Sequence, residues 1–563
     1  MTIRLYTEDW LYNAGIVGLI NILEISAEIE LEKNDHYVEI PNEALENFSD
    51  HYFRYFYYKY KRMTSWYKTV NQKEKLDRFQ LSNFDDKKLD ELNTIVENTK
   101  EKLISNSYNN TFHLLGNSGE RLQVLSKRLK KIKRKKNEEI NDIWESVEET
   151  IQDLKEAIVH LKSPLAQKYI PARNITYDLI GNYWGGVSFL HKEANTNDMY
   201  KSYYEYFITP VIRYLEEKKG DKYEKYKYDC FTCENKMANL YSAYELTWIN
   251  KTGVDSSRKS SHFWNFQSDA YVCPVCNLVY SCVPAGFTYL KGKGIFINEN
   301  STLNTLYHVN QIALDNVEKF EELEEKSYFQ ILDSFEQTKV DKTTKEIQNI
   351  QIVKLDTAKG NSRTPYRFNI LSKDRLTIIA KNKDRFKKIL GIYAKEDKVY
   401  LNLYQEVLTR LYQNQNQFDL IYRLFRLLIN GQFRGISSIR HILYINHQSM
   451  REGKRGSMVG YKKIKQFQYY GIQLRNAYKE QNNKLPGISY RLLNALKLKN
   501  ETNFMNTLIN AYMYKRIQIP LDFIETLQDK DKLQTIGYAF LLGLQGDQGD
   551  QVPTYVKEEE SYE

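Results

Sequence analysis

Two short stretches of this chain share one cysteine spacing, YDCFTCENK at residues 228–236 and YVCPVCNLVYSC at 271–282. The chain has 563 residues and only five cysteines, so these two stretches hold all of them. Four form C-x-x-C pairs: Cys230 with Cys233, and Cys273 with Cys276. A C-x-x-C turn supplies two thiolate ligands, and two such turns complete the tetrahedral shell that Zn²⁺ prefers. We therefore predict a structural Zn²⁺ bound by these four cysteines.

Alternatives to this ligand set remain open at the level of sequence. Cys282 is left over and His262 lies between the pairs, so either residue could replace one ligand. A redox C-x-x-C and simple buried cysteines are the other interpretations, but a redox pair needs a thioredoxin-like context that is absent here. A four-cysteine shell has no open coordination position, so we expect the metal to stabilise a lobe too poor in hydrophobic residues to fold alone.

The charge of the chain is mildly basic, with 81 Lys and Arg against 72 Asp and Glu, so its clustering matters more than its sum. The segment KRLKKIKRKK at 127–136 carries eight cations in ten residues. It is either a solvated face balanced by the acids that follow it or a contact for a phosphate backbone. The predicted DNA contacts here are Lys127, Arg128, Lys130, Lys131, Lys133 and Arg134.

A second basic cluster, REGKRGSMVGYKKIKQF at 451–467, contains three glycines and one acidic residue. A flexible basic loop that leads into a helix can wrap a phosphate backbone, although a solvated linker has the same composition. The predicted contacts are Arg451, Lys454, Arg455, Lys462, Lys463 and Lys465.

Aromatic and cationic residues also alternate in HYFRYFYYKYKRMTSWYK at 51–68. Such a segment can stack bases and hold phosphates. Because Tyr52, Phe56 and Tyr60 recur at helical spacing, we favour a helix that buries its aromatic side chains.

The patterning predicts an α+β, predominantly helical fold with a zinc-ribbon-like lobe and a C-terminal antiparallel helical bundle. The run LTIIA at 376–380 is expected to be a strand, and FDLIYRLFRLLIN at 418–430 a helix. We expect five segments: a mixed N-terminal domain with long charged helices (1–225), the zinc-binding lobe (226–290), a mixed α/β region (291–450), the helical bundle (451–545) and a disordered acidic tail (546–563).

The sequence offers little for catalysis or for membrane insertion. There is no P-loop, G-x-S-x-G or H-E-x-x-H motif, and no acidic or histidine cluster with two-metal spacing. We therefore expect no enzyme activity and name no catalytic residue. No apolar run is long enough to span a bilayer, and the sparse, paired cysteines fit a reducing interior, so a cytoplasmic protein is expected.

The stretch DWLYNAGIVGLINIL at 9–23, the paired C-x-x-C motifs and a helical C-terminus near TIGYAFLLGL at 535–544 resemble the large subunit of type I-B CRISPR Cascade complexes. The resemblance covers most of the chain. It implies a non-catalytic subunit that probes duplex DNA for the flanking motif (PAM), helps to open the duplex and holds the displaced strand. It also implies a prokaryotic host and these partners: CRISPR RNA-bound backbone and handle-binding subunits, target DNA, and a helicase–nuclease.

In type I-B systems the helical small subunit can arise by internal translation from the large-subunit gene. The predicted bundle begins soon after Met458, which makes Met458 the candidate internal start. Two other interpretations of the whole chain remain: a zinc-containing nuclease or nucleic-acid-modifying enzyme, and a structural interaction protein without nucleic acid.

Overall fold

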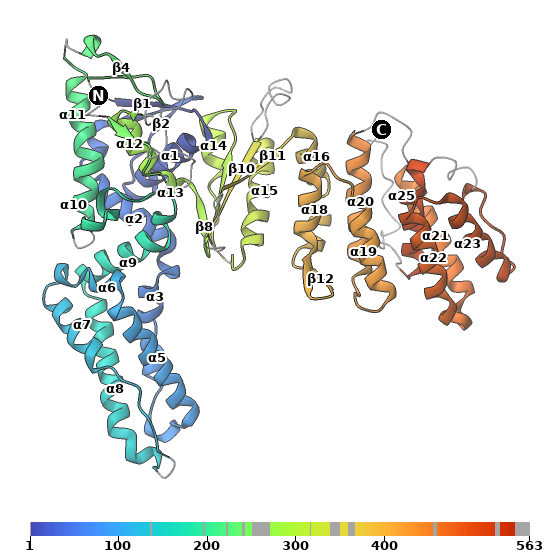
Figure 1. Cartoon of the computed structure of the whole chain (residues 1–563), viewed down its shortest axis with the longest axis horizontal. Helices are drawn as coiled ribbons and strands as arrows, with labels where there is room; N and C mark the ends of the chain where they lie inside the picture. The colour runs from blue at the N-terminus through green and yellow to red at the C-terminus, as the bar shows by residue number, and fades with distance from the viewer. Residues whose placement is uncertain are drawn as a thin grey trace. The chain divides into compact units, whose positions relative to one another are not determined.

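The computed structural model divides the chain into two compact units, residues 1–340 with 350–368, and residues 341–349 with 369–563. Figure 1 shows the elements of each. The predicted α+β, predominantly helical fold is confirmed, whereas the finer division into five segments stays a prediction. No helix in the described part of the chain is long and apolar enough to cross a membrane. The structure describes residues 2–135, 138–194, 197–220, 223–238, 243–249, 271–315, 317–337, 350–357, 366–453, 459–523 and 530–546.

The first unit begins with a small antiparallel sheet and a helix that is buried on all sides. The sheet has the order β1–β3–β2, and helix α1 (Trp10–Asn21) follows β1. Asp9 caps α1 by accepting hydrogen bonds from the backbone N–H groups of Leu11 and Tyr12. Every residue from Tyr12 to Asn21 is buried. The strands are β1 (Thr2–Tyr6), β2 (Glu32–Lys33) and β3 (Tyr37–Pro41).

Helix α2 (Phe48–Tyr60) confirms the helix predicted within residues 51–68, and three of its tyrosines are buried with their hydroxyl groups hydrogen-bonded. Tyr52, Tyr55 and Tyr60 donate to the backbone carbonyls of Ser281, Ala285 and Phe287. These acceptors follow the second cysteine pair, so the aromatic helix packs on the same segment that carries those cysteines.

A second buried cluster in this unit belongs to the long charged helices. Helices α5, α7 and α8 pack side by side (Figure 1) around residues such as Leu92, Leu122 and Leu154. The bounds are α3 (Ser65–Val70), α4 (Lys73–Leu76), α5 (Asp86–Ile104), α6 (Asn106–Asn109), α7 (Asn117–Arg128), α8 (Ile140–Leu161), α9 (Pro164–Asp178), α10 (Met199–Tyr203) and α11 (Thr209–Glu217).

The remainder of the first unit contains the cysteine segments and a sheet of order β11–β10–β9–β8, in which β9 is antiparallel to both neighbours. Its other elements are β4 (Tyr228–Asp229), β5 (Lys236–Met237), β6 (Tyr244–Glu245), β7 (Tyr271–Val272), α12 (Pro274–Ser281), α13 (Val283–Gly286), β8 (Thr288–Leu290), β9 (Lys293–Asn298), α14 (Leu303–Val309), α15 (Phe320–Gln337), β10 (Ile350–Asp356) and β11 (Tyr366–Leu371).

The described residues of the second unit are mainly helical and include the hairpin of β12 and β13. The strand expected at 376–380 is wrong: these residues lie in α16, because a short apolar run does not distinguish a buried helix from a strand. The helix predicted at 418–430 is confirmed as α19. The elements are α16 (Lys373–Lys381), α17 (Lys383–Ile389), β12 (Tyr393–Glu396), β13 (Val399–Asn402), α18 (Leu403–Tyr412), α19 (Phe418–Ile429), α20 (Ile436–Gly453), α21 (Tyr461–Ala477), α22 (Leu485–Lys497), α23 (Glu501–Tyr514) and α25 (Lys530–Leu544).

Two glycines bring α21 and α25 into backbone contact in the C-terminal bundle. A Cβ atom on Gly471 would lie 2.1 Å from the Phe540 carbonyl oxygen, and one on Gly543 would lie 1.9 Å from the Gln468 carbonyl oxygen. Tyr538 of α25 also stacks on the rings of two α19 residues, Phe418 and Phe425. The bundle predicted from residue 451 is therefore covered on one side by an earlier helix.

Candidate metal centre

The first cysteine pair occupies a tight turn of a two-stranded hairpin. Strands β4 and β5 pair antiparallel, and the Cys230 N–H donates to the Asn235 carbonyl at 2.9 Å. Glu234 closes the turn with φ of 56°, the left-handed conformation that such a reversal requires. This arrangement is the C-x-x-C turn expected from the sequence.

The second pair lies at the start of a helix, whereas the sequence predicted a second C-x-x-C turn of a zinc-ribbon-like lobe. Cys273 precedes α12, Pro274 is the first helical residue, and the Asn277 N–H donates to the Cys273 carbonyl at 3.0 Å. Pro is favoured there because its fixed φ suits the first helical position. The expectation of a segment poor in hydrophobic residues is wrong for this half, because Pro274 and Cys276 through Gly286 are buried in the main core of the unit.

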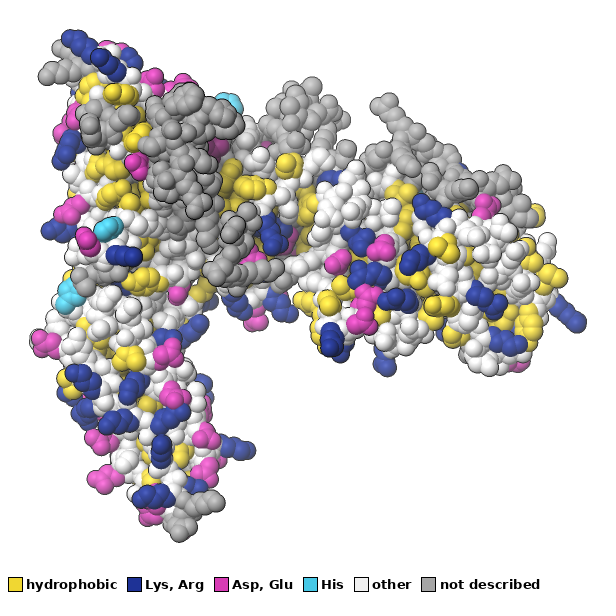
Figure 2. Space-filling model, viewed as in Figure 1, with side chains coloured by type: hydrophobic (Ala, Val, Ile, Leu, Met, Phe, Trp, Pro, Cys, Tyr) yellow, Lys and Arg dark blue, Asp and Glu magenta, His cyan; other side chains and the backbone are white. Residues whose placement is uncertain are grey.

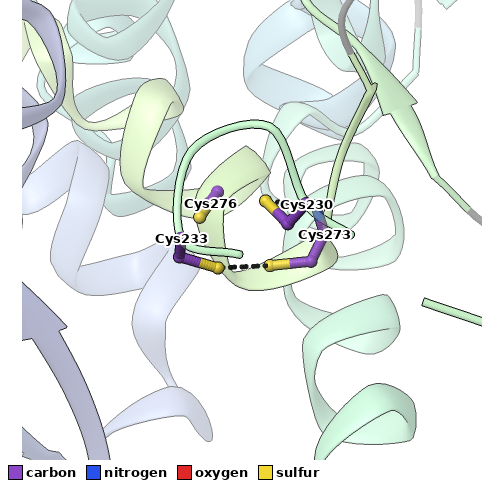
Figure 3. Close-up of side chains that lie close together, drawn as sticks. All are labelled: Cys230, Cys233, Cys273 and Cys276. Atoms are coloured by element: carbon purple, nitrogen blue, oxygen red, sulfur yellow. Dashed lines mark hydrogen bonds between the residues drawn. The ribbon is translucent and has the colours of Figure 1, made fainter. Parts of the chain in front are cut away.

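The four predicted ligands meet in one cluster (Figure 3), in which all four Sγ atoms lie within 4.8 Å of one another. The Sγ atoms of Cys233 and Cys273 are 3.6 Å apart, and none of the four cysteines forms a disulfide bond. A tetrahedral Zn²⁺ with bonds of about 2.3 Å would separate its sulfur ligands by about 3.8 Å. The cluster therefore has the donor atoms and the size of a closed four-thiolate metal site.

Four thiols at this separation cannot all ionise without a cation. Hydrogen bonds from neighbouring thiols, first that of Cys233, lower the pKa of Cys230 far below its usual value. Hydrogen bonding to Cys230 in turn raises the pKa of Cys273 and Cys276 well above theirs. A metal dication would offset the repulsion between neighbouring thiolates, because its positive charge neutralises theirs.

Three further hydrogen bonds reach the sulfurs and orient them. The Cys273 N–H donates to Cys230 Sγ at 3.2 Å, and the Asn235 amide donates to Cys233 Sγ at 3.1 Å. The Tyr12 hydroxyl lies 3.5 Å from Cys276 Sγ, and burial raises the pKa of Tyr12, so the hydroxyl keeps its proton and can donate to a thiolate. Sequence reasoning missed Tyr12, although it lies inside the quoted stretch 9–23.

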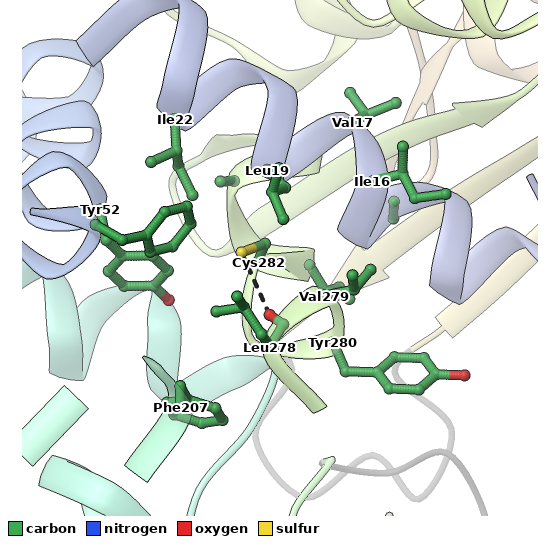
Figure 4. Packing of buried hydrophobic residues seen from close by; sticks show 14 of the residues in the cluster. Ile16, Val17, Leu19, Ile22, Tyr52, Phe207, Leu278, Val279, Tyr280 and Cys282 are labelled. Atoms are coloured by element: carbon green, nitrogen blue, oxygen red, sulfur yellow. Dashed lines mark hydrogen bonds between the residues drawn. The ribbon is translucent and has the colours of Figure 1, made fainter. Parts of the chain in front are cut away.

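Helix α1 also contacts the cysteine-bearing segment through its backbone. A Cβ atom on Gly15 would lie 2.4 Å from the Val279 carbonyl oxygen, and one on Gly18 would lie 2.0 Å from the Cys282 carbonyl oxygen. Figure 4 shows the surrounding packing, with Leu19 of α1 pointing toward the segment that carries Val279 and Cys282. The N-terminal stretch and the cysteine pairs, which are 200 or more residues apart in the sequence, therefore form one packed structure.

Cys282 does not belong to the cluster. Its buried Sγ donates to the Leu278 carbonyl at 3.4 Å (Figure 4), and burial raises the pKa of this thiol to about 12. The other alternative ligand, His262, lies outside the described residues. Among the residues that the structure describes, only the predicted four form a group of metal-ligating side chains.

Acids of α5 and α8 form ion pairs with half of the predicted contacts of the first basic cluster, although all six residues are exposed. Helix α7 ends at Arg128, and the Ile132 backbone is held by the Asn93 amide of α5. Figure 2 shows cationic and acidic side chains intermingled over these helices. The ion pairs are Arg128 with Glu149 and Asp153, Lys131 with Glu97, and Arg134 with Asp86.

The other three predicted contacts of this cluster, Lys127, Lys130 and Lys133, are exposed. Within the described ranges they have no ion-pair partner. These three lysines are thus available to an external anion. The cation that follows each of them in the sequence is instead paired with an acidic side chain of the protein. Sequence patterning alone did not separate these two sets.

The second basic cluster is described only in part. Lys462, Lys463 and Lys465 are exposed in the first two turns of α21 and have no ion-pair partner among the described residues. Cations at a helix N-terminus add to the positive end of the helix dipole, so this end of α21 attracts anions. Arg451 lies in α20, without a described side chain, and Lys454, Arg455 and Met458 lie outside the described residues.

We predict that the purified chain contains one metal ion, and that Cys233→Ser removes it because three thiolates and a hydroxyl bind Zn²⁺ more weakly than four thiolates. Elemental analysis measures the stoichiometry, and the spectrum of the Co²⁺-substituted protein reports the tetrahedral thiolate set. Cys282→Ala is the matched control and should keep the metal. Loss of metal in Cys282→Ala but not in Cys233→Ser would contradict this ligand set.

Tyr12→Phe removes the hydroxyl next to Cys276 and keeps the ring. We expect the metal affinity to fall about tenfold, the lower end of the effect for groups that orient metal ligands. Competition with a chromophoric chelator measures it. Tyr52→Phe is the control, since this buried hydroxyl donates to the Ser281 carbonyl rather than to a sulfur. Equal affinity in the two variants would show that Tyr12 does not support the site.

A comparison with known protein families gives a match that coincides with this site. Residues 223–288 match the family model described as CRISPR-associated protein (Cas_CXXC_CXXC), a segment that contains all four cysteines. No curated protein and no solved structure matches the chain. The segment that builds the candidate metal site is therefore similar to this CRISPR-associated family.

Proposed function

We propose that this protein is the non-catalytic large subunit of a CRISPR RNA-guided surveillance complex of type I-B. In this role it recognises PAM-flanked target DNA, stabilises the R-loop and docks the helicase–nuclease. The observation that carries the proposal is the CRISPR-associated match over residues 223–288, together with the packing of α1 on that segment. Two of the three sequence features behind the family resemblance, the stretch 9–23 and the cysteine pairs, thus belong to one structural unit.

The metal has a structural role in this proposal, and Zn²⁺ is the ion that a four-thiolate set favours. Because the four sulfurs close the coordination shell, no position is left for water or substrate. The ion would fix the hairpin of the first pair against α12 and, through Tyr12, against α1. Recognition of the guide sequence is left to base pairing, as in RNA-guided systems generally.

The partners follow from this role: CRISPR RNA-bound backbone and handle-binding subunits, target duplex and displaced strand, and the helicase–nuclease, in the cytoplasm of a prokaryote. A helical small subunit translated from Met458 would contain α21 to α25. Such a fragment would expose Tyr538, which α19 covers in the full chain. It would therefore need a partner surface in place of α19.

We expect the tagged protein, purified gently from its native host, to carry short RNAs that share one repeat-derived 5′ handle, together with further protein subunits. Sequencing of the bound RNA and mass spectrometry of the proteins are the measurements. A preparation that contains neither guide RNA nor partner subunits would contradict the proposed function.

The unpaired lysines give a sharper test of the DNA surface. Replacement of Lys127, Lys130 and Lys133 by Ala should weaken duplex binding and reduce the slope of log K against log salt by up to about 2.7, at about 0.9 per lost phosphate contact. Fluorescence anisotropy at several salt concentrations measures the slope.

The matched control replaces the three paired cations, Arg128, Lys131 and Arg134, by Ala. This control removes the same number of positive charges from the same segment, but its residues already form ion pairs with acidic side chains of α5 and α8. We expect a smaller change in slope and a lower unfolding temperature. Equal slopes for the two triple variants would exclude a specific contact at the unpaired lysines.

A further inference from the structure

Burial accounts for only one face of the aromatic helix α2. Tyr52, Phe53, Tyr55, Phe56 and Tyr60 are buried in the core. The opposite face presents Arg54, Tyr57, Tyr58 and Lys61, which follow one another at helical spacing, and 56% of Tyr58 is exposed. Rings and cations alternate on this second face, and packing of the core does not explain why they are there.

A cavity of about 180 Å³ opens beside this face, between α2 and α9. Its volume is more than ten times the 10–15 Å³ or so that a single water molecule requires, so it admits an organic group. Its wall includes Phe53, Arg54 and Tyr57 from α2, Gln167 and Lys168 from α9, and Tyr200 from α10.

The charges of the cavity leave one cation without a counter-ion. Lys168 is paired with Asp50 at 2.8 Å and lies 4.2 Å from the centre of the Tyr200 ring. Arg54 is exposed and, among the residues that the structure describes, has no ion-pair partner. The site therefore combines aromatic walls with one uncompensated guanidinium group, which favours a flat ligand that carries a negative charge.

We infer that this cavity binds one unstacked nucleotide of a single-stranded nucleic acid, with its base against the tyrosine rings and its phosphate at Arg54. The inference rests on the proposed function, which requires a displaced strand to be held. Tyr58 and Lys61, whose Nζ lies 5.6 Å from the centre of the Tyr57 ring, continue the pattern along α2 for the neighbouring nucleotide. Alternating rings and cations bind single strands without sequence preference, because every base has a flat face.

The test uses the full-length, metal-loaded chain and a fluorescein-labelled oligothymidylate of ten nucleotides. Arg54→Ala and Tyr58→Ala should each weaken binding about tenfold, since loss of one stacked base or cation contact has an effect of this order. Arg54→Ala should also reduce the salt slope by about 0.7, the value for one phosphate contact on a single strand, whereas Tyr58→Ala should leave the slope unchanged.

Tyr490 and Arg491 are consecutive exposed residues of α22 that do not line the cavity. Tyr490→Ala and Arg491→Ala are therefore the matched controls, because they remove side chains of the same types. Competition with thymidine monophosphate distinguishes the source of the nucleotide. Weak competition indicates a site for a strand, and competition as strong as that of the oligonucleotide indicates a site for free nucleotides.

Oligothymidylate binding that is unchanged by Arg54→Ala, or absent from the wild-type chain, would overturn the inference. Guide RNA that still co-purifies with Arg54→Ala would show that the proposed function survives that failure. Absence of guide RNA from the wild-type protein would instead contradict the proposed function itself.

Discussion

The structure of the first unit depends on the close approach of α1 to α12 and α13. Gly15 and Gly18 of α1 lie against backbone carbonyls of Val279 and Cys282, and Gly286 lies equally close to Ala14. Side chains at these positions would force the helices apart, because a packed interior has no space to accept them. This contact fixes α12, whose first turn holds Cys276, and α12 in turn places two of the four sulfurs.

The metal site is therefore part of the core rather than a separate appendage. Cys230, Cys273 and Cys276 are buried in the same cluster as the residues of α1 and α2. The cysteine hairpin contacts that cluster through its sulfur atoms and through hydrogen bonds such as the one from Cys273 N–H to Cys230 Sγ. In this arrangement, a metal ion would stabilise the interface between distant parts of the chain as well as the hairpin itself.

Much of this organisation could be predicted from the sequence, because it follows from local rules. The C-x-x-C spacing identified the four cysteines that converge, and helical spacing separated the buried aromatic residues of α2. Other features depend on tertiary contacts that local patterns do not encode. Examples are the helix after Cys273, the helical run at 376–380, and the acids Asp86 and Glu149 that neutralise part of the basic cluster.

The central physical claim is that α1 and the metal site form one cooperative structure, and hydrogen–deuterium exchange of the metal-loaded and metal-stripped protein tests it most directly. Backbone amide hydrogens within one cooperative unfolding unit lose their protection from exchange together. The account predicts that removal of the metal lowers protection in α1 (residues 10–21) and α12 (274–281) as well as in the hairpin around 228–237. Loss of protection confined to the hairpin, with α1 unchanged, would contradict it.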